Sequence, residues 1–203
     1  EDVRGAGGLR GVVAREEDGR VGGLVERRVL GELLEEELVR GLGPRWRESL
    51  VEIDEVAVAA ASLGQVHRGT WHDGRDVAVK VQYPGVHEAI ESDLDAAEVM
   101  YAMFSSMMLK GLDAKGLVDE LRDRMREELD YSIEAGNVAE FEARFQGHPW
   151  VRIPKLVPEL CSARVLTTEW IDGMTFDQFR KNASSATKQR SAEVIWRFAQ
   201  GAI

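Results

Sequence analysis

The residues Ala59–Gly69 read AAASLGQVHRG, and Asp76–Gln82 read DVAVKVQ. Small residues at the start of the first stretch predict a turn that leads into a β-strand, and the polar link His72–Arg75 predicts a hairpin turn. The second strand carries one lysine, Lys80, in a mostly apolar run. Together these features are typical of a nucleotide-binding hairpin, in which the turn covers the phosphates and the lysine reaches them.

The second strand has two chemically different faces, because successive side chains of a strand point to opposite sides. A buried ammonium is costly unless anions pair with it, and phosphates together with a carboxylate would supply that pairing. The alternative to a phosphate-binding Lys80 is a lysine that points into water from an edge strand. The apolar face consists of Val77, Val79 and Val81, and the small or polar face consists of Ala78, Lys80 and Gln82.

The turn Ala59–Gly64 has small side chains that let backbone N–H groups approach a ligand, and Ser62 adds a hydroxyl. A tight packing turn or a short helical segment would use the same residues. Alanine allows the backbone less freedom than glycine. This turn should therefore hold phosphates differently from a glycine-rich loop.

Hydrophobic periodicity and turn residues predict the other elements. Residues 1–23 are rich in Gly, Arg, Glu and Asp, and we expect them to be loose or weakly helical. Trp46 and Leu50 should dock the turn after the first helix onto the core. Helices are expected at 25–42, 86–109, 114–145, 176–180 and 186–203, and strands at 51–56, 66–71, 77–82, 151–153 and 164–169.

The long helix expected at 114–145 has an apolar stripe and an acidic face. The stripe should be buried and consists of residues four apart, namely Leu117, Leu121, Met125, Leu129 and Ile133. Because an α-helix turns about 100° per residue, the side chains of the polar face lie within about 80° of one another around the helix axis. In a functional interpretation, one of its carboxylates would pair with Lys80 and another would assist a metal ion. The alternative is that the whole face is exposed to solvent. This face consists of Glu127, Asp130, Glu134 and Asn137.

The composition indicates a soluble domain of ordinary size or part of a larger one, with 203 residues of which 44% are hydrophobic and 31% charged. The net charge of −10 argues against broad nucleic-acid binding. Cys161 is the only cysteine, so no disulfide forms within the chain, and the four histidines show no metal-ligand spacing. The most apolar stretch, Val99–Leu109, is shorter than the ~20 residues of a membrane span. Its methionines suit the core or a partner surface better than a membrane.

The segment Glu169–Gly173 reads EWIDG and ends the last expected strand at a short connector. It is similar to the hinge at which the backbone of a kinase binds adenine, although an ordinary strand exit is the alternative. The order of elements predicts an α+β fold with an antiparallel sheet, that of a protein-kinase-like small lobe followed by the first helices of a truncated large lobe. We expect an N-terminal extension at 1–45, the small lobe at 46–172 and the start of the large lobe at 173–203.

These motifs together resemble the UbiB/ADCK, or ABC1-like, family of atypical kinases. The resemblance covers roughly residues 45–203, and the ordered set of motifs is far more specific than any one of them. The motifs are the alanine-rich signature at 59–68, V-A-V-K at 77–80, Q-Y-P-G-V at 82–86, E-x-D-Y at 128–131, E-A-x-N at 134–137, H-P at 148–149 and V-L-T-T-E at 165–169.

The resemblance implies a domain that binds ATP or ADP with Mg²⁺ and supports ubiquinone or other isoprenoid-quinone biosynthesis, with ATPase activity coupled to lipid or partner proteins. It makes Lys80 the contact of the α- and β-phosphates and Glu134 the partner of Lys80. It also makes Glu128 and Asp130 a regulatory motif that faces a K-x-G-Q segment. The nucleotide-contacting residues that it implies are Ala59, Ala60, Ala61, Ser62, Leu63, Gly64, Val66, Ala78, Lys80, Glu169 and Trp170.

The sequence departs from the family pattern in two ways. No K-x-G-Q occurs in residues 1–50, and Asp172 and Asp177 lie too close to the expected hinge to replace the catalytic-loop and DFG-type aspartates. From the sequence as given we expect weak nucleotide binding and no turnover. The alternatives are a non-catalytic, pseudokinase-like module that binds partners or lipid, and a small-molecule phosphotransferase that shares only the fold.

We expect a nucleotide as one partner. Isoprenoid-quinone precursors, a membrane surface or quinone-biosynthesis proteins are the further candidates, and no nucleic acid is expected. The compartment stays open at this stage. The cytoplasm or the membrane periphery of a bacterium, and the mitochondrion or plastid of a eukaryote, all fit the family.

Overall fold

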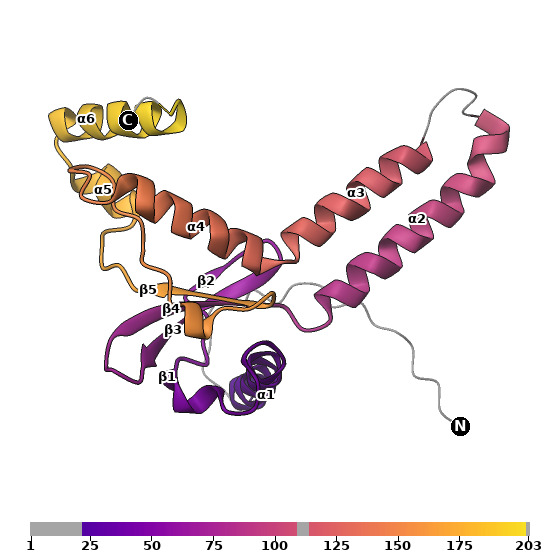
Figure 1. The fold of residues 1–203 in the computed structure, drawn as a ribbon, viewed down its shortest axis with the longest axis horizontal. Helices are drawn as coiled ribbons and strands as arrows, with labels where there is room; N and C mark the ends of the chain where they lie inside the picture. Colours follow the sequence, from indigo (N-terminus) through magenta and orange to yellow (C-terminus); the bar gives the residue numbers. More distant parts are fainter. Residues whose placement is uncertain (1–21, 109–113, 202–203) are drawn as a thin grey trace.

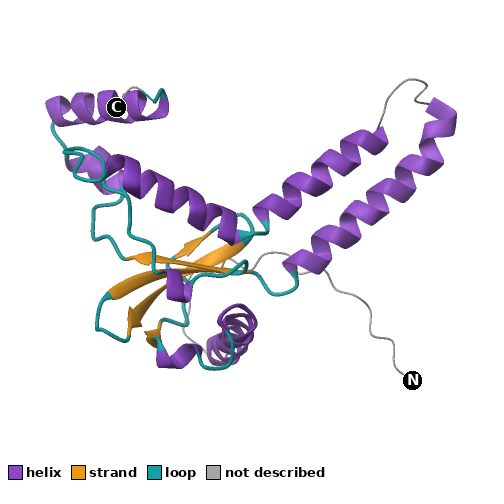
Figure 2. Ribbon diagram, in the orientation of Figure 1, coloured by secondary structure: helices purple, strands orange, loops and turns teal. Residues whose placement is uncertain are grey.

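A computed structural model describes residues 22–108 and 114–201, and one antiparallel sheet forms its centre (Figure 2). The strands follow the order β1-β3-β4-β5, and the short β2 pairs with β3 as well. Helices lie on both faces of the sheet, so the predicted α+β class is confirmed. The strands are β1 Leu50–Ile53, β2 Ala59–Ala60, β3 Gly64–Trp71, β4 Asp76–Gln82 and β5 Val165–Glu169.

Strands β3 and β4 form the predicted hairpin, in which Val66 lies opposite Lys80. Gly74 in the connecting turn has a φ of +86°, a left-handed conformation that glycine adopts without steric cost. The Asp73 carboxylate accepts a hydrogen bond from the Arg75 backbone N–H at 3.1 Å, which is how aspartate stabilises tight turns. Local turn chemistry therefore sets the register that positions Lys80.

One face of the sheet packs against α1, Gly22–Leu42. Trp46 and Leu50 are 4% and 0% exposed, which confirms that they dock onto the core. Because α1 contributes to this core, it folds onto the same sheet as the hairpin, and a domain boundary at residue 45 stays a prediction. The buried residues of this cluster are Leu34, Leu38, Trp46, Leu50, Val77, Val79, Val81, Val157, Leu160 and Val165.

The opposite face of the sheet is partly covered by α4, Tyr131–Phe145. Tyr131 and Ala135 pack with Leu166 of β5 in a second, smaller cluster. Lys80 pairs with Leu166 across β4 and β5, and paired residues point to the same side. Lys80 therefore lies on the α4 face, and the predicted division of β4 into an apolar and a polar face is confirmed.

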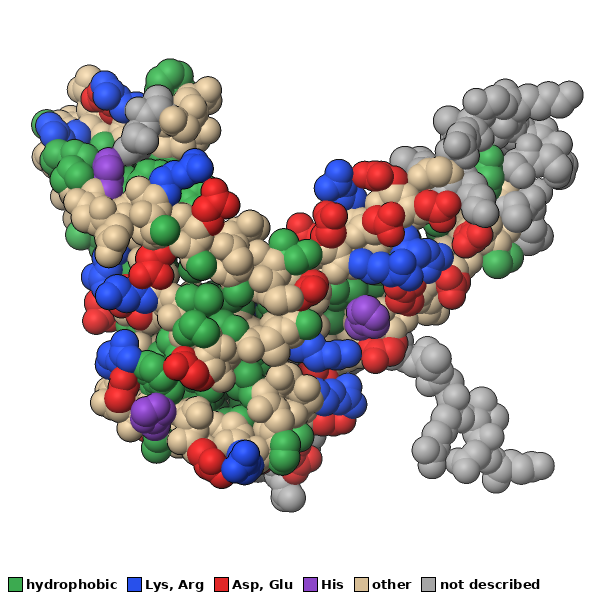
Figure 3. Space-filling view, in the orientation of Figure 1, with side chains coloured by type: hydrophobic (Ala, Val, Ile, Leu, Met, Phe, Trp, Pro, Cys, Tyr) green, Lys and Arg blue, Asp and Glu red, His purple; other side chains and the backbone are tan. Residues whose placement is uncertain are grey.

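Helices α2, Val86–Met108, and α3, Ala114–Glu128, lie side by side and project from the sheet (Figure 1). Charged side chains of both signs lie along this pair (Figure 3). Arg122 and Arg126 of α3 contact Glu91 of α2 at 2.5 and 3.1 Å, so ion pairs join the two helices. Helix α2 begins where expected, and Leu109 lies outside the described residues. No helix in the described ranges has both the length and the apolar character that crossing a bilayer requires.

The single helix predicted at 114–145 is wrong, because the chain breaks between α3 and α4. Asp130 has φ and ψ of −105° and 93°, and its side chain accepts a hydrogen bond from the Ser132 backbone N–H at 3.0 Å. An aspartate in this position satisfies an unpaired N–H and starts a new helix. Hydrophobic periodicity alone does not register such a cap.

The predicted buried stripe is also wrong. Leu121 and Ile133 are 46% and 47% exposed, Leu129 is buried, and Met125 is half-buried. The side chain of Leu117 lies outside the described residues. Because α3 packs on α2 whereas α4 packs on the sheet, the two helices bury different faces and share no common stripe.

Two expected strands differ from the structure, whereas the last two expected helices are confirmed. Residues 151–153 form no strand, and the following segment contributes only an isolated bridge between Leu156 and Thr168; Pro154, which has no N–H, interrupts the run. Val56 lies beyond the end of β1. The last two helices form, as α5 Phe176–Asn182 and α6 Ser185–Ala199. The expectations for residues 1–21 and 202–203 lie outside the described residues.

Candidate functional site

Lys80 and Glu134 form an ion pair that joins β4 to α4. Lys80 Nζ donates to Glu134 Oε2 at 2.5 Å. The side chains are 23% and 45% exposed, respectively, so the pair lies at the edge of the protein interior and is open to solvent on one side. An ammonium has three N–H donors, and those not used by Glu134 remain for another anion. The fold thus brings together the two residues that the sequence resemblance paired.

Tyr131 lies beside this ion pair. The Lys80 ammonium is 4.3 Å from the centre of the Tyr131 ring, which is within cation–π range. The Tyr131 hydroxyl is buried and has no hydrogen-bond partner in the described part of the chain. Burial, and after it the charge of Glu134, raises the pKa of Tyr131 to about 12. No separate role for Tyr131 was expected from the sequence, although its place one helical turn before Glu134 puts both on one face.

The alanine-rich segment is a short strand followed by a tight turn, and not one continuous turn as predicted. Ala59–Ala60 form β2 and pair with β3. The turn closes where the Ala61 N–H donates to the Gly64 carbonyl at 2.8 Å, and the Leu63 carbonyl accepts from the Tyr83 N–H at 3.0 Å. These bonds anchor both ends of the turn to the sheet, so its shape is set by strand pairing.

Gly64, where this turn enters β3, lies close to β4 and α4. A Cβ at Gly64 would lie 2.3 Å from the Val81 carbonyl oxygen and 2.7 Å from the Tyr131 hydroxyl. Such distances leave no room for a side chain. Ser62, near the tip of the turn, is exposed to solvent.

Val66 and Ala78 lie on the same face of the sheet as Lys80. Val66 is the cross-strand partner of Lys80, and Ala78 precedes Lys80 by two positions in β4 and lies opposite Thr168. Both side chains are half-buried. They form a small apolar surface beside the ammonium, against which the flat face of an adenine ring could pack.

Glu169 and Trp170 mark the end of β5, where the sequence suggested a hinge. Their backbone N–H groups already donate to the carbonyls of Lys155 and Asp76 at 2.8 and 3.0 Å. The Glu169 carboxylate accepts from Arg152 at 3.1 Å. Both N–H groups are thus used within the protein, which leaves the carbonyl groups of this segment as its possible contacts to a base.

The acidic residues predicted on one helix face lie on two helices, so that prediction is wrong. Glu127 belongs to α3 and accepts a hydrogen bond from Arg124 at 3.2 Å. Asp130 caps α4, which contains Glu134 and Asn137. Glu128, which belongs to the expected regulatory motif and not to this face, is exposed. In the described part of the chain, Glu134 is the member of the predicted face that pairs with Lys80.

A family model described as the ABC1 atypical kinase-like domain matches residues 28–200. The chain belongs to this family. The predicted resemblance is therefore confirmed, as is the kinase-like small-lobe fold.

Several curated relatives of this ABC1-like chain carry the names of mitochondrial or chloroplastic kinases. It is 40% identical over 146 residues to the mitochondrial atypical kinase COQ8B of Rattus norvegicus, a match that covers 72% of this chain and 27% of the relative. It is 35% identical over 164 residues to the mitochondrial atypical kinase COQ8 of Saccharomyces cerevisiae, covering 81% and 32%. The chloroplastic protein ACTIVITY OF BC1 COMPLEX KINASE 1 of Arabidopsis thaliana is 39% identical over 145 residues, covering 70% and 21%.

This ABC1-like chain thus spans about a fifth to a third of the length of these relatives. Among solved structures, an Rv3197–erythromycin complex from Mycobacterium tuberculosis matches with a TM-score of 0.65 and 35% identity. That match covers 81% of this chain and 44% of the solved one.

Proposed function

We propose that this ABC1-like chain is the part of an atypical kinase that binds ATP or ADP with Mg²⁺. The observation that carries the proposal is the Lys80–Glu134 ion pair at 2.5 Å, which lies on the sheet face next to the alanine-rich turn. A lysine held by a helix glutamate is the usual contact of the α- and β-phosphates in kinase-like sites. The remaining Lys80 N–H groups would bind phosphate oxygens.

Other residues of the chain would hold the rest of the nucleotide. Val66 and Ala78 would contact the base, the backbone at 61–64 would lie over the phosphates, and the carbonyls of Glu169 and Trp170 would face the base edge. Mg²⁺ would enter with the phosphates, because Mg²⁺ in such sites is bound through substrate phosphates and one or two carboxylates. The nucleotide would supply the transferable phosphoryl group.

The whole protein, in this proposal, supports ubiquinone or another isoprenoid-quinone pathway, and its partners are quinone precursors, a membrane surface or other proteins of that pathway. The family membership supports this assignment. The mitochondrial and chloroplastic names of the relatives favour an organelle, if the source is a eukaryote.

A titration of the full-length protein with a fluorescent ADP analogue and Mg²⁺ tests nucleotide binding. Lys80→Ala should weaken binding roughly tenfold or more, because it removes a charge-assisted contact to phosphate. Lys181→Ala is the matched control, since Lys181 is exposed in the last turn of α5, and it should leave affinity unchanged. Equal affinity of the wild-type and Lys80→Ala proteins would contradict the proposal.

A second candidate function, a module that binds lipid or a partner protein, is favoured by one surface of α2. Val99 and Met100 are 61% and 59% exposed, and apolar side chains at such exposure suit an interface. Co-sedimentation of the protein with phospholipid vesicles, compared with a Val99→Ser, Met100→Ser variant, tests this candidate. Equal sedimentation of both proteins would contradict it.

A further inference from the structure

Gln82 is a buried amide at the end of the strand that carries Lys80. It is 2% exposed, and it shares the Lys80 face of β4. Burying an amide without hydrogen bonds costs free energy, so a glutamine in this place needs partners. The partners show what the side chain does.

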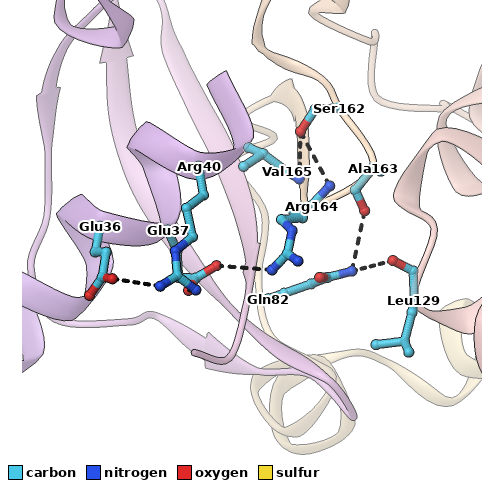
Figure 4. A network of polar contacts seen from close by, with 9 residues as sticks. All are labelled: Glu36, Glu37, Arg40, Gln82, Leu129, Ser162, Ala163, Arg164 and Val165. Atoms are coloured by element: carbon cyan, nitrogen blue, oxygen red, sulfur yellow. Dashed lines mark hydrogen bonds and ion pairs between the residues drawn. The ribbon is translucent and has the colours of Figure 1, made fainter. Parts of the chain in front are cut away.

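The amide of Gln82 joins two segments that are distant in sequence (Figure 4). Gln82 Nε2 donates to the Leu129 carbonyl and, at 3.2 Å, to the Ala163 carbonyl. Leu129 is the last residue before the cap of α4, and Ala163 precedes β5. One side chain of β4 therefore holds both the start of α4 and the chain that leads into β5.

The Ala163 carbonyl also accepts a hydrogen bond from the Tyr131 backbone N–H at 3.0 Å. Gln82 and the first residue of α4 thus share one acceptor. Glu134 follows one helical turn later, so the position of this helix start decides whether Glu134 reaches Lys80.

The segment that supplies the Ala163 carbonyl is itself fixed (Figure 4). Ser162 Oγ accepts hydrogen bonds from the backbone N–H groups of Arg164 and Val165, both at 3.2 Å. Arg164 lies 3.6 Å from the buried carboxylate of Glu37 in α1. The anchor of α4 is therefore held from the opposite face of the sheet, through a polar network.

Apolar packing holds α4 to the sheet less strongly than it holds α1. Its buried side chains in the described chain are Tyr131 and Ala135, whereas α1 shares a much larger core. The preceding helix, α3, packs on α2 and projects away from the sheet (Figure 1). The hydrogen bonds of Gln82 are thus well placed to determine where α4 begins.

We propose that Gln82 is a positioning residue, which holds the N-terminus of α4 against β4 and so keeps Glu134 at Lys80. This inference rests on the proposed nucleotide-binding function of that ion pair. Gln82 does not touch the pair, and it acts through the backbone of Leu129 and Ala163.

The first test is a double-mutant cycle on the affinity of the full-length protein for a fluorescent ADP analogue with Mg²⁺. Gln82→Leu keeps the size of the side chain and removes its donors, and Glu134→Gln removes the charge of the pair. Gln82→Leu should weaken binding roughly five- to tenfold, and it should add nothing in the Glu134→Gln background, because both changes remove the same interaction. Independent, multiplying losses, or an unchanged affinity of Gln82→Leu, would overturn the proposal.

Val79→Ala is the matched control for lost stability. Val79 is fully buried in the same strand but faces α1, so its truncation should lower the melting temperature and leave the affinity of the folded protein unchanged. Gln82→Asn, a shorter amide that cannot span the distance, is measured in parallel. Failure of both Gln82 variants to fold would overturn the proposal, since Gln82 would then be needed for folding itself.

A second measurement needs no nucleotide. The side-chain ¹⁵N signal of Lys80, in protein labelled at lysine, reports whether its ammonium is paired. The signal in Gln82→Leu should move to its position in Glu134→Gln and stay in place in Val79→Ala; an unmoved signal in Gln82→Leu would overturn the proposal. If the signal moves as expected but the wild-type protein binds no nucleotide, the positioning role stands and the proposed function fails.

Discussion

Gly64→Ala tests the close approach of the alanine-rich turn to the ion-pair face of the sheet. The added Cβ would lie 2.3 Å from the Val81 carbonyl oxygen and 2.7 Å from the Tyr131 hydroxyl. Since ordinary contact begins near 3.4 Å, turn and strand would have to separate by about 1 Å. No side-chain rotation relieves the first contact, because a backbone oxygen in the centre of the sheet makes it.

The magnitude of the effect follows from this geometry. Overpacking a well-packed site costs about 1–3 kcal/mol, and the backbone clash places Gly64→Ala in the upper part of that range. Alanine also restricts the unfolded chain, which returns roughly 0.4–1 kcal/mol. The free energy of unfolding should therefore fall by about 2 kcal/mol, which corresponds to a loss of about 4–8 °C in melting temperature for a domain of this size.

Urea denaturation followed by circular dichroism measures this change. Gly136→Ala is the matched control, because a Cβ at Gly136 meets nothing within 4 Å. Gly136 lies inside α4, where alanine should stabilise the protein by roughly 0.5–1 kcal/mol. Wild-type stability of Gly64→Ala would refute the close approach of the turn to β4 and Tyr131.

Three further predictions concern the buried polar groups. Tyr131→Phe should leave stability unchanged or raise it by up to about 1 kcal/mol in thermal unfolding, because the buried hydroxyl it removes has no partner in the described chain; a clear loss would show that the hydroxyl is bonded. Arg164→Met should cost about 1–3 kcal/mol in urea denaturation, because it weakens the pairing of buried Glu37, and Glu37→Leu in the same protein should restore part of the loss; no recovery would contradict that pairing. Burial lowers the pKa of His67 from its ordinary value of 6.5. The stability contributed by neutral His67 is therefore complete above that value and is lost as the pH falls from it through the folded-state pKa. The urea midpoint should thus decrease more in the wild type than in His67→Gln between about pH 7.5 and about pH 5.5, and equal decreases would contradict this.

The hairpin could be predicted from the sequence because its determinants are local. Alternating valines in 77–81 indicate a strand with one buried face, and Asp73 and Gly74 specify the turn between the two strands. The register of β3 and β4 follows from that turn. The strand face on which Lys80 lies therefore follows from local sequence alone.

The pairing of Lys80 with Glu134 was expected from the family resemblance. The bounds of the helix that carries Glu134 were predicted wrongly. Periodicity over 114–145 suggested one helix, but Asp130 caps a second one. Continuous spacing of apolar residues does not reveal whether two helix segments bury the same face. The acidic face and the buried stripe were consequently predicted from a geometry that the chain does not adopt.

By itself, the sequence determined the hairpin of β3 and β4, the turn between them and the family, because short-range periodicity, turn chemistry and motif order carry that information. Only the tertiary structure decided the roles of Tyr131, Gln82 and Glu37. The deciding contacts join distant parts of the chain: Gln82 contacts carbonyls 47 and 81 residues further on, and Glu37 of α1 pairs with Arg164. Backbone carbonyls have no sequence signature, so a side chain that binds them is recognised only when folding places the two segments together.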